Sequence, residues 1–178
     1  MRFLPAAAVS MALLTGCMAS QPPTVPAEHR KLIRKAAGRC RGLDAGTVAA
    51  QLYVESKFDP QARSRVGARG IAQFMPDTWS TWGRDENGDG VASPLQPEDA
   101  IPAQVRLMCH LMARAQASGV PGDRLTLALA AYNAGWSAVE QARGVPDYPE
   151  TVAYVEKIRD LAPRYRLRSR PDPRVTRQ

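Results

Sequence analysis

The sequence is poor in histidine and cysteine, with two and three of them among 178 residues. His29 and His110 are far apart, and the neighbours Cys109 and His110 would point to different faces of a helix, so no zinc site is indicated. No Ser-His-Asp arrangement, phosphate-binding loop or base-binding motif is present. No run of strand length alternates between apolar and polar residues, so any sheet would be minor. These absences argue against zinc enzymes, serine-nucleophile enzymes and nucleic-acid-binding proteins.

The length and composition indicate one globular domain with a basic surface. A chain of 178 residues is typical of a single domain, and a hydrophobic content of 44% is enough for a core. The formal net charge of +7 favours anionic partners such as polymers or lipid headgroups. Because base-binding motifs are absent, we expect no nucleic-acid partner.

Apolar residues recur mainly with a helical period, which predicts an all-α domain over residues 28–163. Asp99 is expected to be the N-cap of one helix, and the almost wholly apolar stretch 125–134 predicts a central buried helix. Besides the helix described next, predicted helices cover residues 28–39, 75–82, 99–117, 125–134, 137–142 and 150–161.

Glu55 is the first candidate for chemistry. Asp44 is of a residue type that typically begins a helix. Val48, Leu52 and Glu55 then recur at i, i+4 and i+7, which puts the carboxyl on the apolar side of that helix. Pro60 ends this helix soon after Glu55. Partial burial and the negative end of the helix dipole both raise the pKa of a carboxyl, as a general acid near neutral pH requires. The alternative is an ordinary surface glutamate at a helix end.

A glycine-rich loop follows this helix. Gly67 and Gly70 indicate sharp backbone turns, with Ser64 just before them and Gln73 just after. A loop folded back over the helix end would place backbone groups and an amide beside Glu55. Neutral donors and acceptors around one acid are what a sugar substrate needs.

Three segments in order, between residues 42 and 162, resemble the lytic transglycosylases of the soluble Slt type, which are lysozyme-like enzymes that cut peptidoglycan. One departure is Ala72, where the family commonly has Met, at a position tied to one sugar subsite. The resemblance implies an all-α, lysozyme-like domain with little or no sheet and a catalytic cleft. The residues that carry it are Glu55-Ser56-Lys-Phe58-Asp-Pro60 with Ala62, Ser64, Gly67-Ala68, Gly70, Gln73 and Met75-Pro76, then Ala130-Ala-Tyr-Asn-Ala-Gly135, then Glu150-Thr151-Val-Ala-Tyr-Val-Glu-Lys-Ile158.

The resemblance also implies a reaction that uses one carboxyl and requires no cofactor. Glu55 would cleave the β-1,4 bond between N-acetylmuramic acid and N-acetylglucosamine and leave a 1,6-anhydromuramyl product. Glu150 would hydrogen-bond near Glu55 or simply cap the last helix. Alternatives are a hydrolytic goose-type lysozyme and a non-catalytic wall-binding lipoprotein. We expect a monomer that binds peptidoglycan glycan strands, with a cleft lined by Ser64, Gln73, Tyr132, Asn133 and Tyr154.

The two ends of the sequence differ from its middle. Residues 1–17 read as a targeting segment whose apolar stretch is too short to span a bilayer, and Leu14-Thr-Gly-Cys17 resembles a lipobox. Lipidated Cys17 would anchor an extracytoplasmic protein to a bacterial membrane, the outer one where the source has two. The alternative is an ordinary signal peptide. Residues 18–27 read as an extended proline-rich tether, and 164–178 as a basic, disordered tail.

If Cys17 is lipidated, Cys40 and Cys109 remain as an even pair in an oxidising compartment. A disulfide closing a loop of about 70 residues would contribute roughly 4 kcal/mol on the chain-entropy estimate. The alternative is two unpaired core thiols.

The stretch 85–90 resembles the opening of an EF-hand loop. Asp85, Asn87 and Asp89 stand at relative positions 1, 3 and 5, with Gly90 at position 6. Position 12 is Gln96, not the usual acid. The stretch is therefore either a structural calcium site or an ordinary acidic turn.

Overall fold

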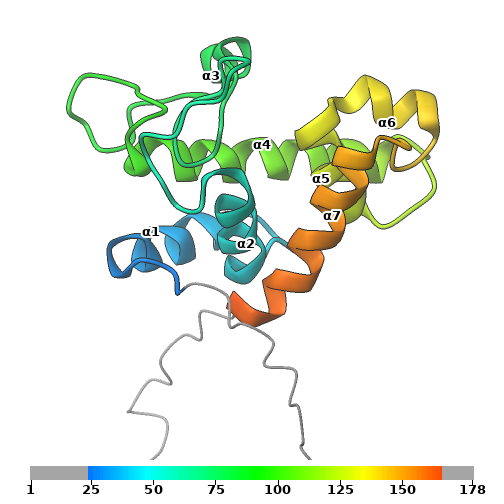
Figure 1. Ribbon diagram of the computed structural model, residues 1–178, viewed down its shortest axis with the longest axis horizontal. Helices are drawn as coiled ribbons and strands as arrows, with labels where there is room; N and C mark the ends of the chain where they lie inside the picture. The colour runs from blue at the N-terminus through cyan, green and yellow to red at the C-terminus, as the bar shows by residue number, and fades with distance from the viewer. Residues whose placement is uncertain (1–23, 166–178) are drawn as a thin grey trace, which may run out of the picture.

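The computed structural model describes residues 24–165 and shows an arrangement of helices (Figure 1). Within this range there is no strand, only two isolated bridges, Arg63 with Arg69 and Arg69 with Phe74. The prediction of an all-α fold is confirmed. The helices are α1 (Ala27–Ala37), α2 (Ala45–Ser56), α3 (Pro76–Trp82), α4 (Pro97–Ala117), α5 (Arg124–Ala134), α6 (Trp136–Ala142) and α7 (Pro149–Leu161), followed by the 3-10 segment η1 (Ala162–Tyr165).

Local capping chemistry explains where two of these helices begin. The Asp44 carboxylate accepts from the Thr47 amide at 3.0 Å, and Asp123 accepts from the Thr126 amide at 2.9 Å. Each bond satisfies an N–H group that has no partner within the helix. Helices α3, α4 and α7 instead begin with a proline in the first turn, where its fixed φ favours helix formation.

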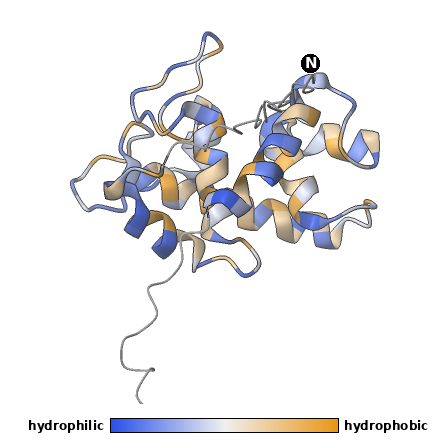
Figure 2. Cartoon of the chain, turned by 60° about the horizontal axis from the view of Figure 1, so that its bottom comes forward, coloured by the Kyte–Doolittle hydropathy of each residue, from blue (hydrophilic) through white to orange (hydrophobic). Residues whose placement is uncertain are grey.

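Helix α4 is the longest and runs across the molecule, with α1 and α2 near one part of it and α5 near another (Figure 1). It packs against α1 and α5, while α2 packs against α7. The hydropathy view shows apolar and polar segments alternating along the helices, as amphipathic helices require (Figure 2). Helix α5 buries Leu127 through Ala131, which confirms the predicted central helix. None of the helices within residues 24–165 combines the length and apolarity that a membrane crossing needs.

The structure corrects the prediction that Asp99 is an N-cap. Helix α4 begins two residues earlier, at Pro97, so Asp99 lies inside its first turn. The Asp99 side chain is fully buried and accepts from the Glu86 amide at 2.8 Å and the Ser93 amide at 3.0 Å. Asp99 therefore ties the loop that precedes α4 to the helix.

The packed domain begins earlier than residue 28. Val25 is buried in the core, its carbonyl accepts from Arg30 Nε at 2.9 Å, and α1 begins at Ala27. The last residues of the predicted tether are thus part of the fold. Cys17, the rest of the tether up to residue 23, and residues 166–178 of the predicted tail lie outside the described residues.

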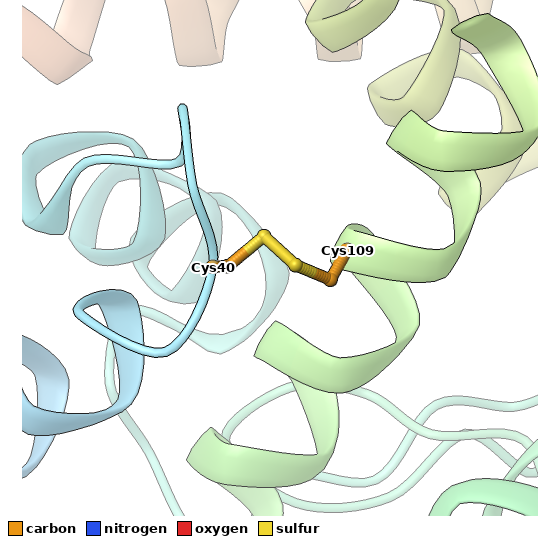
Figure 3. Close-up of a disulfide and its surroundings, with 2 residues drawn as sticks. All are labelled: Cys40 and Cys109. Atoms are coloured by element: carbon orange, nitrogen blue, oxygen red, sulfur yellow. A yellow bond between two sulfur atoms is a disulfide. The ribbon is translucent and has the colours of Figure 1, made fainter.

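A disulfide joins Cys40, in the turn after α1, to Cys109 of α4 (Figure 3). The two Cα atoms are 5.7 Å apart, and 69 residues separate the cysteines in the sequence. The predicted pairing is confirmed, and the alternative of two free thiols is wrong. The bond fastens the α1–α2 region to the longest helix.

Candidate active site

Glu55 lies in the last turn of α2, as predicted, and the backbone reverses immediately after it. Lys57 and Phe58 both have left-handed backbone conformations, with φ of 58° and 68°. Phe58 is buried, and its ring centroid lies 5.8 Å from that of Tyr53 and 5.9 Å from that of Tyr165. This aromatic packing holds an unfavourable backbone reversal in place and so fixes the end of the helix that carries Glu55.

The loop of residues 57–75 is held against the end of α2. Ser56 Oγ donates to the Ile71 carbonyl at 2.8 Å. Gly70 has a φ of +78°, and a Cβ atom there would lie 1.7 Å from the Pro94 carbonyl oxygen, so only glycine fits. The loop is therefore fixed on both sides, and its inner face forms a wall beside Glu55.

A cleft of about 510 Å³ opens between this loop, the end of α2, the end of α5 and one face of α7. All seven residues predicted for the site line this cleft, although they come from four segments of the chain. The predicted residues are Glu55, Ser64, Gln73, Tyr132, Asn133, Glu150 and Tyr154, and the others in the lining are Val54, Val66, Ala68, Met75, Ala153 and Lys157.

Burial raises the pKa of Glu55 from its ordinary 4.5 to about 7. The Tyr154 hydroxyl opposes this, because it donates to Glu55 Oε1 at 2.5 Å and stabilises the carboxylate. The negative charge of Glu150 adds to the rise. Near neutral pH, Glu55 can therefore both donate and accept a proton.

Two tyrosines border the carboxyl, of which Tyr154 is buried and Tyr132 is partly buried. The Tyr154 hydroxyl accepts from Gln51 Nε2 at 3.0 Å, and the Tyr132 hydroxyl donates to the Ala72 carbonyl at 2.8 Å. Burial and the charge of Glu55 raise the pKa of both phenols well above 10.0, so both stay neutral. Ala72 itself is fully buried and is not among the cleft-lining residues, so its side chain forms none of that wall.

The neutral polar residues of the cleft are partly occupied by bonds within the protein. Ser64 Oγ accepts from the Ala68 amide at 2.9 Å, and Gln73 Nε2 donates to the Gly70 carbonyl at 2.9 Å. Thr151 donates to Asn133 Oδ1 at 2.7 Å, which leaves the Asn133 amide hydrogens to donate elsewhere. These bonds fix the orientation of the groups that a substrate would meet.

Glu150 fits neither role expected from the sequence. It stands in the first turn of α7, but no side chain caps that helix by a hydrogen bond. Within residues 24–165, no hydrogen bond joins Glu150 to Glu55, and Glu150 acts on Glu55 through its charge. The next acid after Glu55, Asp59, accepts from the Gln61 amide at 2.8 Å and is not among the residues that line the cleft.

Sequence reasoning missed four residues around the site. Val66 and Met75 are exposed apolar side chains on the loop, with Val66 77% exposed. Lys157 follows Glu150 and Tyr154 at i+7 and i+3 on α7, a spacing that could have revealed it. Gln51 contacts Tyr154 across 103 residues of sequence, and no local pattern predicts that contact.

The 85–90 loop lies away from the cleft. Its acidic side chains accept from the backbone of the loop itself: Asp85 Oδ1 from the Gly88 amide at 2.7 Å and Asp89 Oδ1 from the Val91 amide at 2.8 Å. Among residues 24–165, no three His, Cys, Asp or Glu side chains are grouped so that they could hold a metal ion. Asp85, Asn87 and Asp89 supply two carboxylates and one amide, and calcium binding there stays a prediction.

Helices arranged around a cleft, with one partly buried carboxyl of raised pKa, define a helical, lysozyme-like domain. The family described as "Transglycosylase SLT domain" matches residues 31–151. The chain belongs to this family.

Curated relatives share the domain but are much longer. The chain is 36% identical over 116 residues to "Membrane-bound lytic murein transglycosylase F" of Desulfosudis oleivorans. The aligned residues make up 65% of this chain and 24% of the relative. It is 37% identical over 101 residues to the protein of the same name from Pseudoalteromonas translucida, with 57% and 20% covered. The chain thus matches at most a quarter of the length of these relatives.

Solved structures show the same fold. The 70 kDa soluble lytic transglycosylase of Escherichia coli superimposes with a TM-score of 0.61 at 22% identity, over 78% of this chain and 24% of that one. An inactive mutant of lytic transglycosylase Slt from Pseudomonas aeruginosa superimposes with a TM-score of 0.59 at 28% identity, over 79% and 24%.

Proposed function

We propose that this chain is a peptidoglycan lytic transglycosylase with Glu55 as its single general acid and base. The observation that carries the proposal is the partly buried Glu55 carboxyl in the cleft, whose pKa of about 7 suits both proton donation and proton recovery. Membership of the transglycosylase SLT domain family and the names of the curated relatives support the same activity.

The first step breaks the glycosidic bond between N-acetylmuramic acid and N-acetylglucosamine. Protonated Glu55 gives its proton to the bridging oxygen as the bond from that oxygen to the muramyl C1 breaks. The 2-acetamido group of the substrate stabilises the positive charge that develops at C1, which is a recognised exception to the use of two carboxylates.

The second step closes the anhydro ring. The ionised Glu55 removes the proton of the muramyl C6 hydroxyl, and the C6 oxygen forms the new bond to C1. Glu55 ends protonated, as it began, so no water is consumed and no cofactor is needed. The Tyr154 hydroxyl, which donates to Glu55 Oε1, stabilises the carboxylate between the two steps.

The remaining cleft residues suit a neutral sugar chain. The Asn133 amide and the hydroxyl of Ser64 offer polar groups from two different segments of the cleft lining, and both side chains are held by bonds within the protein. Preset groups of this kind bind with a smaller entropic penalty than mobile ones. We assign Ser64, Gln73, Tyr132, Asn133, Glu150 and Tyr154 to glycan binding, and the partner is a peptidoglycan glycan strand bound by a monomer.

Hydrolysis is the competing reaction, and Glu150 is the reason to consider it. This second carboxylate lines the same cleft and could activate a water for attack at C1, as in a lysozyme. A non-catalytic wall-binding protein is the less supported alternative, because such a protein has no need of a partly buried acid with a raised pKa.

The products distinguish these functions. Purified sacculi are digested with wild-type protein and with Glu55→Gln, and the released muropeptides are analysed by mass spectrometry. We expect wild type to release fragments with 1,6-anhydromuramyl ends, which are lighter by one water than reducing ends, and the variant to release almost none. Reducing ends would mean a lysozyme, and no release by either protein would mean a binding protein.

The place of action is part of the proposal. The curated relatives are named membrane-bound, and peptidoglycan lies outside the cytoplasmic membrane. We propose an extracytoplasmic protein anchored through lipidated Cys17, in the outer membrane where the source has two membranes. Leu14-Thr-Gly-Cys17 supports this anchor, and residues 18–23 would connect it to the packed domain.

A further inference from the structure

A buried glutamine stands directly behind the acid. Gln51 lies one helical turn before Glu55 on α2 and is fully buried. Its Nε2 donates to the Tyr154 hydroxyl at 3.0 Å and lies 3.6 Å from Met108 Sδ. Tyr154 in turn donates to Glu55 Oε1, so three side chains form one directed series of hydrogen bonds.

Stability does not explain a glutamine at this position. Its Oε1 is buried and has no hydrogen-bond partner among the described residues. Burying an amide oxygen without a partner costs free energy, and an apolar side chain of the same size would avoid that cost. The other end of the same amide, however, donates to the phenol of Tyr154, which in turn donates to Glu55.

We propose that Gln51 is a positioning residue that fixes the direction of the Tyr154 hydroxyl and so keeps the acidic proton of Glu55 on Oε2. The proposal deepens the proposed function and rests on it. A phenol has one hydrogen to donate. Because the Gln51 N–H points at the phenol oxygen, that hydrogen is directed to Glu55 Oε1. With Oε1 already accepting, the proton of neutral Glu55 belongs on Oε2, to which no side chain within residues 24–165 donates.

The other charged and titratable groups around Glu55 are few. Helix α7 contributes Glu150 and Lys157 besides Tyr154, and α5 contributes Tyr132. The loop wall contributes only neutral side chains to the cleft, such as Ser64, Gln73 and Met75. Gln51 therefore differs from these groups in acting through Tyr154 and not through a charge of its own.

Losing the Gln51 amide has two expected effects. In Gln51→Met the phenol is free to turn and accept the proton of neutral Glu55, which stabilises the acid form. The pKa of Glu55 should rise by about half a unit to one unit. The proton would then be shared between the two carboxyl oxygens, so kcat should fall by about two- to tenfold while KM stays unchanged.

Gln104→Met is the matched control. Gln104 is also a fully buried glutamine, it lies on α4, and neither of its side-chain polar atoms has a partner among the described residues. The same substitution there removes the same group without touching Tyr154. We expect it to leave the Glu55 pKa and kcat as in wild type.

The direct test is a pH titration of the Glu55 carboxyl by ¹³C NMR in wild type, Gln51→Met and Gln104→Met. Melting temperatures establish that each variant is folded. The titration needs no substrate, so it tests the hydrogen-bond series from Gln51 through Tyr154 to Glu55 independently of activity. If wild type released no muropeptides, only the proposed function would be refuted. An unchanged or lower Glu55 pKa in Gln51→Met, or an equal rise in Gln104→Met, would overturn the proposal.

A double-mutant comparison gives the kinetic test. In a Tyr154→Phe background there is no phenol to orient, so adding Gln51→Met should change neither kcat nor the pH profile further. Independent, multiplying losses in kcat would mean that Gln51 acts on the packing of α2 and not through Tyr154.

Discussion

The Tyr154 hydroxyl donates to Glu55 Oε1 at 2.5 Å, across 99 residues of sequence. Glu55 comes from α2 and Tyr154 from α7, and these helices pack against each other. The acid therefore acquires its partner only when the last helix of the domain has docked. The unusual pKa of Glu55 is a property of the folded chain and not of the helix that carries it.

This pKa predicts the pH dependence of activity. Glu55 must be protonated to start the reaction, so kcat/KM should fall as the pH rises through about 7. The negative charge of Glu150 contributes to the raised pKa. Glu150→Gln should therefore move the fall to lower pH, as measured by muropeptide release at constant ionic strength. A profile without a fall between pH 6 and 9 would contradict the role of Glu55.

Glu55→Gln should remove activity and yet stabilise the protein above neutral pH. The pKa of Glu55 is raised on folding, so its contribution to the free energy of unfolding is lost as the pH rises from about 4.5 to about 7. The amide of the Glu55→Gln variant does not ionise, so the variant does not lose this contribution to the free energy of unfolding. The variant should exceed wild type by on the order of 2 kcal/mol at pH 8 and match it more closely at pH 4.5.

Denaturant unfolding at pH 4.5, 6 and 8 measures this difference. Glu156→Gln is a control, because Glu156 is an exposed glutamate that does not line the cleft. If Glu55→Gln were equally stable relative to wild type at all three pH values, the carboxyl would not carry the burial penalty inferred for it.

The site was predictable where local periodicity determines position. Val48, Leu52 and Glu55 share one side of α2, so the partial burial of Glu55 follows from sequence spacing. Asp99 resembled an N-cap, but its actual partners are the amides of Glu86 and Ser93, in a loop that no helix rule describes.

Contacts between distant helices were not predictable. Nothing in the sequence of α2 distinguishes Gln51 from its neighbours. Its role depends on the contact with Tyr154, which lies 103 residues later in the sequence on α7. Glu150 was expected either to hydrogen-bond near Glu55 or to cap the last helix, whereas its effect on Glu55 is a charge effect that depends on how α7 lies along the cleft. Such relationships depend on the packing angles of helices, which sequence period does not determine.

Cys40→Ser should lower the melting temperature without changing the reaction of folded molecules. The disulfide closes a segment of 69 residues and constrains the unfolded chain, which corresponds to roughly 4 kcal/mol at most. Thermal melts with and without reductant measure the effect. Reduced wild type should resemble Cys40→Ser/Cys109→Ser, whose own melting temperature should not respond to reductant. A reductant-insensitive wild type would contradict a stabilising bond.

Cys17→Ala should abolish membrane anchoring, because lipidation requires the thiol. We expect the wild-type protein in the membrane fraction of the source cells and the variant unprocessed or displaced from that membrane. Radiolabelled palmitate incorporation checks the modification directly, with Cys40→Ser as the matched cysteine control. A variant still processed and membrane-bound like wild type would mean that another segment anchors the protein.

Calcium, if it binds the 85–90 loop, should stabilise the fold only weakly. The loop offers three side chains with oxygen atoms, whereas calcium usually takes six to eight oxygen ligands. Gln96 occupies the place of the usual bidentate acid, and its amide donates to Asp89. Weak sites of extracellular modules have dissociation constants of about 0.1–1 mM. At about 5 mM calcium, mass action would then add roughly 1–2 kcal/mol, a shift of a few degrees in melting temperature.

The competing explanation is that Asp99 shapes this loop without any ion. Asp99 accepts from the Glu86 and Ser93 amides, so the loop is tied to α4 at two points. Melting curves in calcium and in chelator, for wild type and Asp89→Ala, distinguish the two. Bound calcium predicts a shift in wild type that Asp89→Ala lacks, because Asp89 would be a ligand. The same melting temperature for wild type in calcium and in chelator would show that the loop is an acidic turn, held in shape by the buried Asp99.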